Sequence, residues 1–264
     1  MSESAIISTT DSRGVTRITL NRPDKRNAFD DRIISELTDA IEAAGSDPGC
    51  RVVVLAGEGR HFSAGADLNY MKRTARLSSQ ENIDDARRLA GLMQALDRLE
   101  RPTLCLVQGA AYGGALGLIC AADIAIGTEN SQFCLSEARL GLTPAAIGPY
   151  VVRTLGPRHA RRYFQTAEVI HSQRALELGL IHERVPDDTL EARAEELVAA
   201  LLRNGPVAMA AGKALVADVS GGAIPEEMIR QTAGVIARLR TGEEGQEGLA
   251  AYFDKRTPHW AVTS

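Results

Sequence analysis

The sequence lacks the features that mark several common classes of protein. Its 264 residues include only four cysteines, with neither a CxxC pair nor a Cys/His spacing typical of metal ligands, so we expect no disulfide framework and no metal site. No stretch approaches the length of a membrane span, and the N-terminus has neither a basic region nor a long apolar region of a secretory leader. These absences predict a cytoplasmic protein that is not embedded in a membrane.

Positive charge is not in excess either. The formal net charge is −4 at pH 7. Without a basic stripe, nucleic acid is not expected as the main partner. Hydrophobic residues make up 44% of the chain, which is enough for a full core. A chain of this length and composition is expected to form one large domain, or a domain with an appendage.

The hydrophobic pattern changes along the chain. Apolar runs at 5–8 and 15–20 predict a hairpin, and further strands are predicted at 52–55, 103–107, 123–126 and 133–135. Helices are predicted from Asp30 to about residue 45, and at 68–71, 89–99 and 114–122. The polar segment 74–84 has no periodicity and is interpreted as a flap. Later helices are expected at 146–155, 158–166, 172–178, 189–203, 206–217, 225–239 and 243–254, with one strand at 181–185. The alternation predicts βαβ units with a parallel core, and the last helices either cover that core or dock on a partner subunit.

Two small-residue turns stand between a predicted strand and a predicted helix. They span residues 61–68 (HFSAGADL) and 109–117 (GAAYGGALG). Such turns leave backbone N–H groups without partners. Two of them on neighbouring strands would direct two donors at one oxygen, which is the arrangement of an oxyanion hole. The plainer interpretation, that these glycines only allow a helix to pack closely on a strand, stays open at this point.

Five motifs, in this order, resemble the crotonase (enoyl-CoA hydratase/isomerase) superfamily. They are residues 21–28 (NRPDKRNA), 62–68 (FSAGADL), 109–114 with 122–124, 133–137 (FCLSE) and 252–256 (YFDKR). The resemblance runs over roughly residues 5–257. It implies an α/β crotonase fold, in which a spiral of repeated ββα units is followed by a C-terminal helical trimerisation region. Residues 1–200 would form the core with the CoA and acyl site, and residues 201–264 the region for oligomerisation and CoA capping.

The resemblance also implies an acyl-CoA thioester as substrate, no separate cofactor, and a homotrimer or a hexamer formed by two trimers. The thioester oxygen would accept hydrogen bonds from the N–H groups of Ala66 and Gly114. Tyr252 and Lys255 of a neighbouring subunit would touch the adenine end. The remaining substrate-binding and CoA-binding residues that it implies are Lys25, Arg26, Ala28, Ala64, Asp67, Leu68, Gly117 and Arg139. For Asp67 we favour a structural role as the N-cap of a helix that begins at Leu68.

The catalytic carboxylates depart from the family pattern. Two-carboxylate hydratases of the family carry a glutamate where this chain has Gly117, and only the second glutamate, Glu137, is present. A lone glutamate is most often an exposed surface residue. The position of Glu137 after a buried strand instead favours a catalytic role. One carboxylate can deprotonate water and return the proton, or move a proton between C2 and C4 of the acyl chain, so hydration and isomerisation both stay open.

A finer resemblance is to the bacterial methylglutaconyl-CoA hydratase group. It rests on Gly117 with Glu137, and on residues 133–142, 149–152 and 247–258. It implies hydration of 3-methylglutaconyl-CoA to 3-hydroxy-3-methylglutaryl-CoA in leucine and isovalerate catabolism, or of isohexenylglutaconyl-CoA in terpene catabolism. The substrate's free carboxylate predicts a cationic partner, for which Arg139, Arg153 and His171 are unranked candidates. The space beside Gly117 is hypothesised to admit the methyl branch or that carboxylate. A non-catalytic protein that binds acyl-CoA or RNA on the same scaffold is the third alternative.

Overall fold

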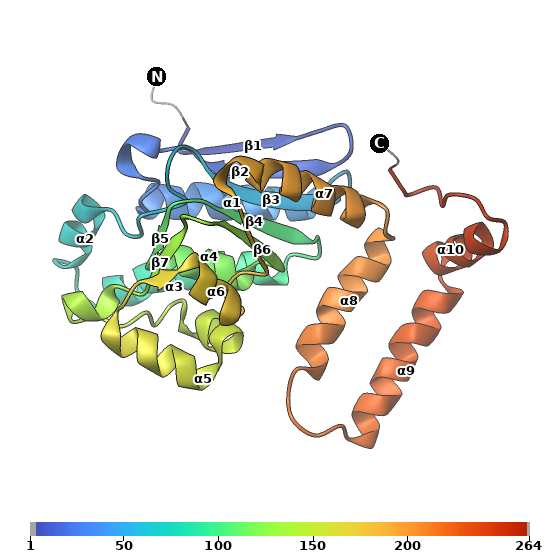
Figure 1. The fold of residues 1–264 in the computed structure, drawn as a ribbon. Coiled ribbons are helices and arrows are strands. Elements are labelled where there is room, and N and C mark those ends of the chain that lie inside the picture. Colours follow the sequence, from blue (N-terminus) through green and yellow to red (C-terminus); the bar gives the residue numbers. More distant parts are fainter. Residues whose placement is uncertain (1–3, 263–264) are drawn as a thin grey trace.

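Six strands form the main sheet, in the order β1-β2-β3-β4-β6-β9 (Figure 1). The computed structural model describes residues 4–262. The strands are β1 (Ile6–Thr10), β2 (Val15–Leu20), β3 (Val52–Gly57), β4 (Thr103–Val107), β6 (Ile124–Thr128) and β9 (Glu183–Val185). β1 and β2 are antiparallel, and every later pair in this sheet is parallel. The predicted hairpin and parallel core are therefore confirmed.

Helices cover both faces of this sheet. On one face lie α1 (Asp31–Ser46), α3 (Ser79–Arg98), α4 (Gly114–Ala121) and α5 (Gly148–Thr166), whose buried residues share the larger core with β2, β3 and β4. α7 (Leu190–Leu202) lies on the opposite face and buries Leu190, Ala194, Val198 and Leu202 there. Every residue of α4 after Gly114 is buried, which agrees with the absence of a polar face in its sequence.

A second, smaller sheet positions the turns. It contains β5 (Ala110–Tyr112), β7 (Gln132–Cys134) and β8 (Ile170–His171). β4, β5 and α4 follow one another along the chain, and so do β6, β7 and the short 3-10 helix η2 (Glu137–Leu140) that precedes α5. In each of these two units, the first strand belongs to the main sheet, the second strand belongs to the smaller sheet, and a helix follows. The expected spiral of ββα units is confirmed, although the sequence pattern alone missed β5 and β8.

The segment 74–84 is not the flap that was expected. α2 (Leu68–Thr74) ends there, and α3 begins at Ser79. The Ser78 side chain accepts a hydrogen bond from the N–H of Glu81, whose carboxylate in turn accepts one from the N–H of Ser78. This capping box begins the helix. The first turns of α3 are polar because its buried residues, Leu92, Met93 and Leu96, come only in its second half.

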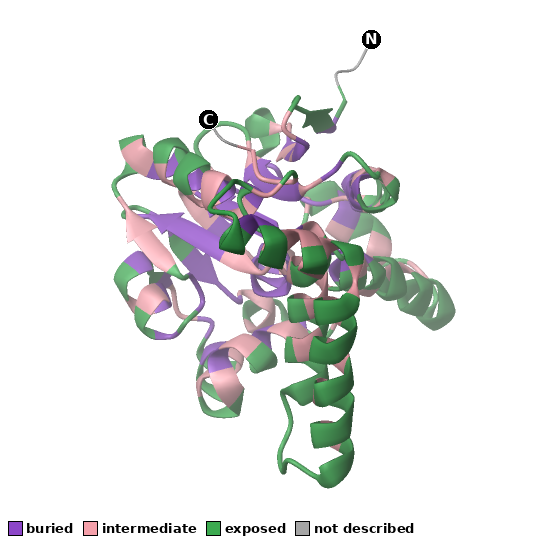
Figure 2. Cartoon of the chain, turned by 90° about the vertical axis from the view of Figure 1, so that its right-hand side faces the viewer, coloured by how far each residue is buried: buried purple, intermediate pink, exposed green. Residues whose placement is uncertain are grey.

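The last three helices stand away from the sheet (Figure 1). They are α8 (Pro206–Val219), α9 (Glu226–Thr241) and α10 (Glu243–Phe253), and they match the predicted ranges closely. Figure 2 shows this helical extension as a mixture of exposed and intermediate residues, and Ala251 on α10 is its buried residue. Lys213 on α8 ties it to the core through a 2.9 Å ion pair with Asp123. Among residues 4–262, no helix has both the length and the apolar character needed to cross a bilayer.

Candidate active site

A buried asparagine fixes the loop that precedes α1 against the first turn. Asn27 is completely buried, and its side-chain amide donates to the carbonyls of Glu58 and His61 at 2.9 Å each. The N–H of Ala64 donates to the carbonyl of Arg26 at 2.9 Å. Arg26 and Asn27 both have a positive φ, of 52° and 53°. The loop is therefore bent sharply and held against the turn.

The two small-residue turns are bonded to each other. The N–H of Ser63 donates to the carbonyl of Ala110, and the N–H of Tyr112 donates to the carbonyl of Ser63, both at 3.0 Å. Gly65 has φ of 87°, and a Cβ there would lie only 2.9 Å from the carbonyl oxygen of Tyr112. Glycine is required at this position by both its backbone conformation and its close approach.

The backbone N–H groups of Ala66 and Gly114 are among those at these turns that have no protein acceptor within residues 4–262. Ala66 lies between two residues that are hydrogen-bonded to Phe29. The N–H of Phe29 donates to the carbonyl of Gly65, and the N–H of Asp67 donates to the carbonyl of Phe29, both at 2.7 Å. Gly114 is the first residue of α4, where an N–H has no partner within the helix. These are the two donors that the sequence predicted for an oxyanion hole.

The carboxylate of Glu137 faces both turns. Its Oε1 lies 3.4 Å from the position that a Cβ on Gly113 would take, and that position is 3.9 Å from the Cα of Gly65. The N–H of Gly113 donates to the carbonyl of Cys134 at 2.9 Å, which holds the second turn beside the strand that leads to Glu137. The structure thus brings one carboxylate to the side of the paired turns.

Burial changes the acidity of Glu137. Its Oε2 is buried and receives no hydrogen bond from any residue of the described chain, 4–262. Burial raises the pKa of this carboxyl above its ordinary value, and a hydrogen bond from its own backbone N–H opposes the rise. A carboxyl whose pKa is raised holds a proton more readily, which suits a group that accepts and returns one.

Comparison with known proteins places this arrangement in a family. The family model for enoyl-CoA hydratase/isomerase matches residues 10–262. The 2,3-dehydroadipyl-CoA hydratase of Escherichia coli is 31% identical over 245 residues, covering 92% of this chain and 94% of that protein. The structure is similar to that of an enoyl-CoA hydratase from Shewanella pealeana, with 48% identity and a TM-score of 0.94 over 97% of this chain and 96% of that one. It is also similar to AtuE of Pseudomonas aeruginosa, with 36% identity and a TM-score of 0.93 over 98% and 100%.

The chain belongs to the enoyl-CoA hydratase/isomerase (crotonase) family. The expectations of a crotonase fold and of an enzyme of the enoyl-CoA hydratase type are therefore confirmed. An acyl-CoA thioester as substrate is consistent with the family. The alternative of a non-catalytic binding protein is not supported.

The space beside Gly117 is filled by protein. A Cβ at this position would lie 2.7 Å from the Sδ of Met93, and closer still to the Cγ2 of Ile147. Both distances are too short for real atoms. The hypothesis that Gly117 leaves room for a methyl branch or a carboxylate of the substrate is wrong in this crotonase, because the buried side chains of Met93 on α3 and of Ile147 just before α5 already occupy that room.

Asp67 has the structural role that was favoured for it. Its carboxylate accepts hydrogen bonds from the N–H groups of Asn69 and Tyr70, at 2.8 Å and 3.2 Å, and so caps α2. The guanidinium of Arg22 lies 3.8 Å from it. Leu68, the next residue, is 74% exposed although it is apolar. An exposed leucine beside the free N–H of Ala66 is compatible with contact to a bound substrate.

The residues expected along the CoA groove gather around the first turn. Lys25 and Arg26 are exposed at the end of a short 3-10 helix, η1 (Pro23–Lys25), while Ala28 is buried. Ala64 is half-buried next to them. Two cations thus lie close to the turn that carries the Ala66 N–H, where they suit phosphate groups of a nucleotide.

Two of the three candidates for a cationic partner of a substrate carboxylate have other contacts, and the third is exposed. Arg139 donates to the carbonyl of Ala167 at 2.5 Å. Arg153 pairs with Asp97 and lies over the ring of Tyr150. His171 is an exposed residue of β8. None of these contacts directs a cation toward Glu137.

Tyr252 and Lys255 lie on and just after α10, away from the two turns (Figure 1). Tyr252 is 79% exposed, and Lys255 has φ of 55°. Within one chain they do not join the site that contains Glu137. Their expected role in CoA binding needs a neighbouring subunit, as the family resemblance implied.

Sequence reasoning missed His61, which joins the two turns. Its Nδ1 accepts a hydrogen bond from the N–H of Ala110 at 3.0 Å. Only a neutral ring accepts at Nδ1. Burial, and then the charges of Arg60 and Arg26, lower the pKa of His61. Its position at the start of the first turn, directly before Phe62, was the available signal.

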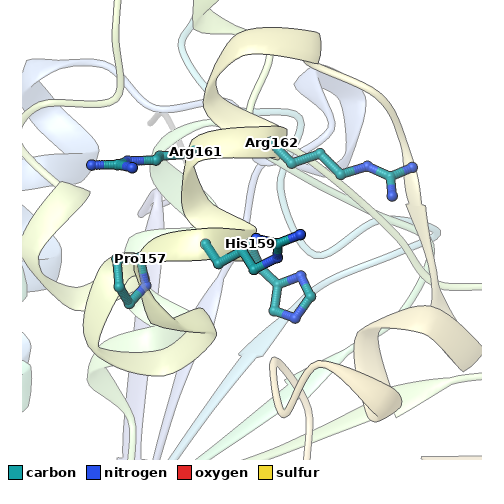
Figure 3. Close-up of a pocket in the computed structure, with 5 residues that line it drawn as sticks. Pro157, His159, Arg161 and Arg162 are labelled. Carbon is teal, nitrogen blue, oxygen red and sulfur yellow. The ribbon is translucent and has the colours of Figure 1, made fainter.

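A separate hollow on α5 is not part of this site. Pro157, Arg158, His159, Arg161 and Arg162 line it (Figure 3). Figure 3 shows the guanidinium groups of Arg161 and Arg162 pointing away from each other. Arg162 is also paired with Glu168. Arg161 and Arg162 therefore do not converge on one point in this hollow.

Proposed function

We propose that the protein adds water to an α,β-unsaturated acyl-CoA, with Glu137 as its single acid and base. The observation that carries this proposal is the carboxylate of Glu137, whose buried Oε2 has no hydrogen-bond partner within residues 4–262, beside two turns that each present a free N–H. The substrate would supply the missing partners, because its thioester oxygen accepts from the N–H groups of Ala66 and Gly114. Removal of one such donor typically costs about 3 kcal/mol of transition-state stabilisation.

The proposed reaction needs one carboxylate for two proton transfers. Glu137 takes a proton from water as the water oxygen forms a bond to C3. The electrons of the C2–C3 double bond move toward the thioester, and the negative charge on its oxygen is held by the N–H groups of Ala66 and Gly114. Glu137 then gives the proton to C2. The net change is the addition of one water molecule, and the raised pKa of Glu137 favours the return of the proton.

We propose 3-methylglutaconyl-CoA as the substrate, with 3-hydroxy-3-methylglutaryl-CoA as the product. The support is the finer sequence resemblance, together with the E. coli relative named for 2,3-dehydroadipyl-CoA, whose acyl group also ends in a carboxylate. Isohexenylglutaconyl-CoA is the related alternative. Because Arg139 and Arg153 are engaged elsewhere, the substrate carboxylate would be bound by backbone N–H groups, by solvent or by a neighbouring subunit.

Isomerisation of a Δ3-enoyl-CoA to the Δ2 form is the second candidate. The observation that favours it is that a side chain at position 117 has no room, so the site keeps one carboxylate. Movement of a proton from C2 to C4 needs one carboxylate and no activated water. The same N–H groups would hold the enolate oxygen.

We also propose that the active form is a homotrimer, alone or paired as a hexamer. In this assembly Tyr252 and Lys255 of one subunit would cap the CoA that is bound by Lys25 and Arg26 of the next. The support is the exposure of Tyr252 and its distance from its own chain's turns.

The test is turnover of three substrates at matched enzyme concentration: 3-methylglutaconyl-CoA, crotonyl-CoA and trans-3-hexenoyl-CoA. Preference for the first supports the proposed hydratase. Preference for crotonyl-CoA supports hydration and overturns the proposed acyl group. Preference for trans-3-hexenoyl-CoA identifies an isomerase. Turnover of none of them, with acyl-CoA still bound, overturns both proposed reactions.

A further inference from the structure

The helix that follows the first turn is anchored by one buried side chain. α2 begins at Leu68, two residues after Ala66, and the structure describes all of its residues. Among them only Tyr70 is buried, and its side chain belongs to the larger core. The other residues of α2 are half-buried or exposed. Tyr70 is therefore the residue through which this helix packs on the body of the protein.

The hydroxyl of Tyr70 binds a carboxylate on α3. It donates to Oδ2 of Asp85, whose side chain is only 14% exposed, and Arg88 donates to the other oxygen of that carboxylate at 2.8 Å. Burial, and then the hydrogen bond to Asp85, raise the pKa of Tyr70 above its ordinary value. The hydroxyl thus keeps its proton and remains a donor. Hydrogen bonds to an ionised acceptor are stronger than those between neutral groups.

A second tie joins α2 to α1, but it lies at the surface. Arg73 pairs with Asp31 at 2.6 Å, and both side chains are 54% exposed. Exposed ion pairs contribute little to holding a segment in place, because water solvates both charges when they separate. The hydrogen bond from Tyr70 to Asp85 is therefore the stronger of these two ties.

Backbone hydrogen bonds carry this tie toward the first predicted oxyanion donor. The N–H of Tyr70 donates to the carboxylate of Asp67 at 3.2 Å, and the N–H of Asp67 donates to the carbonyl of Phe29 at 2.7 Å. Ala66 directly precedes Asp67. A displacement of Tyr70 would therefore move the residue next to the free N–H of Ala66.

The helix that holds Tyr70 also contacts the second donor. Leu89 follows Asp85 by four residues, so the two side chains lie on one face of α3. Leu89 lies 3.9 Å from the position that a Cβ on Gly114 would take, and the ring of Phe29 lies 3.3 Å from it. One face of α3 thus meets both the helix that follows Ala66 and the helix that begins at Gly114.

We propose that Tyr70 is a positioning residue, which fixes the N–H of Ala66 relative to that of Gly114 through its hydrogen bond to Asp85. Both donors must reach one thioester oxygen, so their spacing decides how well they hold the charge that develops there. This inference rests on the proposed function, because it concerns the two donors to which that function assigns the thioester oxygen.

Tyr70→Phe removes only the hydroxyl and tests this directly. We expect kcat for the preferred enoyl-CoA to fall roughly 10-fold, which is less than the loss typical of removing a whole oxyanion donor. The Kd of hexanoyl-CoA, a saturated thioester, should stay unchanged, because its oxygen does not gain the charge of the transition state. Asp85→Ala should lower kcat as much, whereas Asp85→Asn, whose side-chain oxygen still accepts, should retain most of it.

Tyr163→Phe is the matched control. Tyr163 is a buried tyrosine of α5, and its hydroxyl accepts one hydrogen bond, from Nε of Arg174 at 3.4 Å. Its loss should leave kcat unchanged. An unchanged kcat in Tyr70→Phe, or an equal fall in Tyr163→Phe, overturns the proposal. A rise in the Kd of hexanoyl-CoA that accounts for the whole loss of activity also overturns it.

A vibrational measurement tests the two donors without any turnover. Hexanoyl-CoA that is isotopically labelled at its thioester carbonyl carbon is bound, and difference infrared spectroscopy gives its C=O stretching frequency. Hydrogen bonds from the N–H groups of Ala66 and Gly114 lower this frequency. The lowering should be smaller in Tyr70→Phe than in the unchanged protein or in Tyr163→Phe, and equal frequencies in all three overturn the proposal.

The same measurement separates the proposal from the proposed function. If the unchanged protein turns over none of the enoyl-CoA thioesters but still lowers the C=O frequency, the proposed reaction fails. A smaller lowering in Tyr70→Phe then still supports the positioning role of Tyr70, and an equal lowering overturns it. If the unchanged protein binds hexanoyl-CoA without lowering the frequency, the two N–H groups do not hold the oxygen, and both proposals are overturned.

Discussion

At the scale of single residues, His61 makes the link between the two turns depend on pH. Its neutral Nδ1 accepts from the N–H of Ala110, and its pKa lies below the ordinary value of 6.5. The unfolded chain therefore binds this proton at higher pH than the folded chain does. The stability that the neutral ring contributes is fully present above pH 6.5, and it is lost as the pH falls through the lower folded pKa.

His61→Asn should remove this dependence while keeping an acceptor for the Ala110 N–H. As the pH is lowered from 7.5 to 5.5, we expect the Tm of the unchanged protein to fall relative to the Tm of His61→Asn. Thermal unfolding across that range measures it. A difference that stays constant with pH would mean that protonation of His61 does not weaken this link.

The candidate site residues differed in how readily the sequence indicated them. Glu137, Ala66 and Gly114 were proposed because they lie in motifs next to predicted strands that resemble the family pattern. The packing at Gly117 was not predictable, because its neighbours Met93 and Ile147 are each more than 20 residues away in the sequence. A glycine in a helix indicates a close approach, but it does not tell which residue makes it.

At the scale of elements, the N-cap of α2 also orients the first turn. Asp67 caps α2 through Asn69 and Tyr70, and its own N–H is bonded to Phe29, which leaves the N–H of Ala66 free between two fixed neighbours. We expect Asp67→Ala to cost about 1 kcal/mol of stability. We also expect it to lower kcat more than it weakens binding of a saturated acyl-CoA, because charge develops on the thioester oxygen only during the reaction.

Asp67→Asn is the matched variant, since its side-chain oxygen still accepts both hydrogen bonds. It should retain most of the stability and of kcat. Denaturant unfolding and steady-state kinetics on both variants check this. If Asn impairs kcat as much as Ala does, the charge of Asp67 matters more than the cap.

The elements themselves were largely predictable where hydrophobic residues recur regularly. The buried residues of α1 (Ile33, Ile34, Leu37, Ile41 and Ala44) are those that the helical spacing predicted. The polar start of α3 was missed because a capping box, and not an apolar stripe, begins that helix. β5 and β8 were missed because strands of three and two residues leave no periodic pattern.

At the scale of the whole molecule, the helical extension exposes many apolar side chains. They are Val207, Val216, Val219, Ile224, Ile229, Ile236, Leu249, Tyr252 and Phe253. Such a concentration of exposed apolar residues is typical of a protein interface. It is consistent with the proposed trimer, in which each site takes residues from two chains.

Mixed oligomers should reveal such shared sites. Glu137→Gln lacks the base, and Lys255→Glu combined with Tyr252→Ala lacks the CoA cap, so each should have little activity by itself. The two variants are co-expressed with different tags, and oligomers that contain both are isolated by purification on each tag in turn. In these mixed oligomers, some sites combine an intact Glu137 with an intact cap from the neighbouring subunit. We expect these mixed oligomers to be clearly more active than either parent. Mixed oligomers no more active than the parents would contradict the shared site.

The most direct test of the account is Glu137→Gln, measured for both binding and turnover. The amide preserves the size of the side chain but does not accept a proton. The account predicts that acyl-CoA affinity is nearly unchanged, and that turnover of the preferred enoyl-CoA falls by roughly 10²-fold or more. Turnover at the unchanged rate, with the same affinity, would show that Glu137 is not the acid and base of this enzyme.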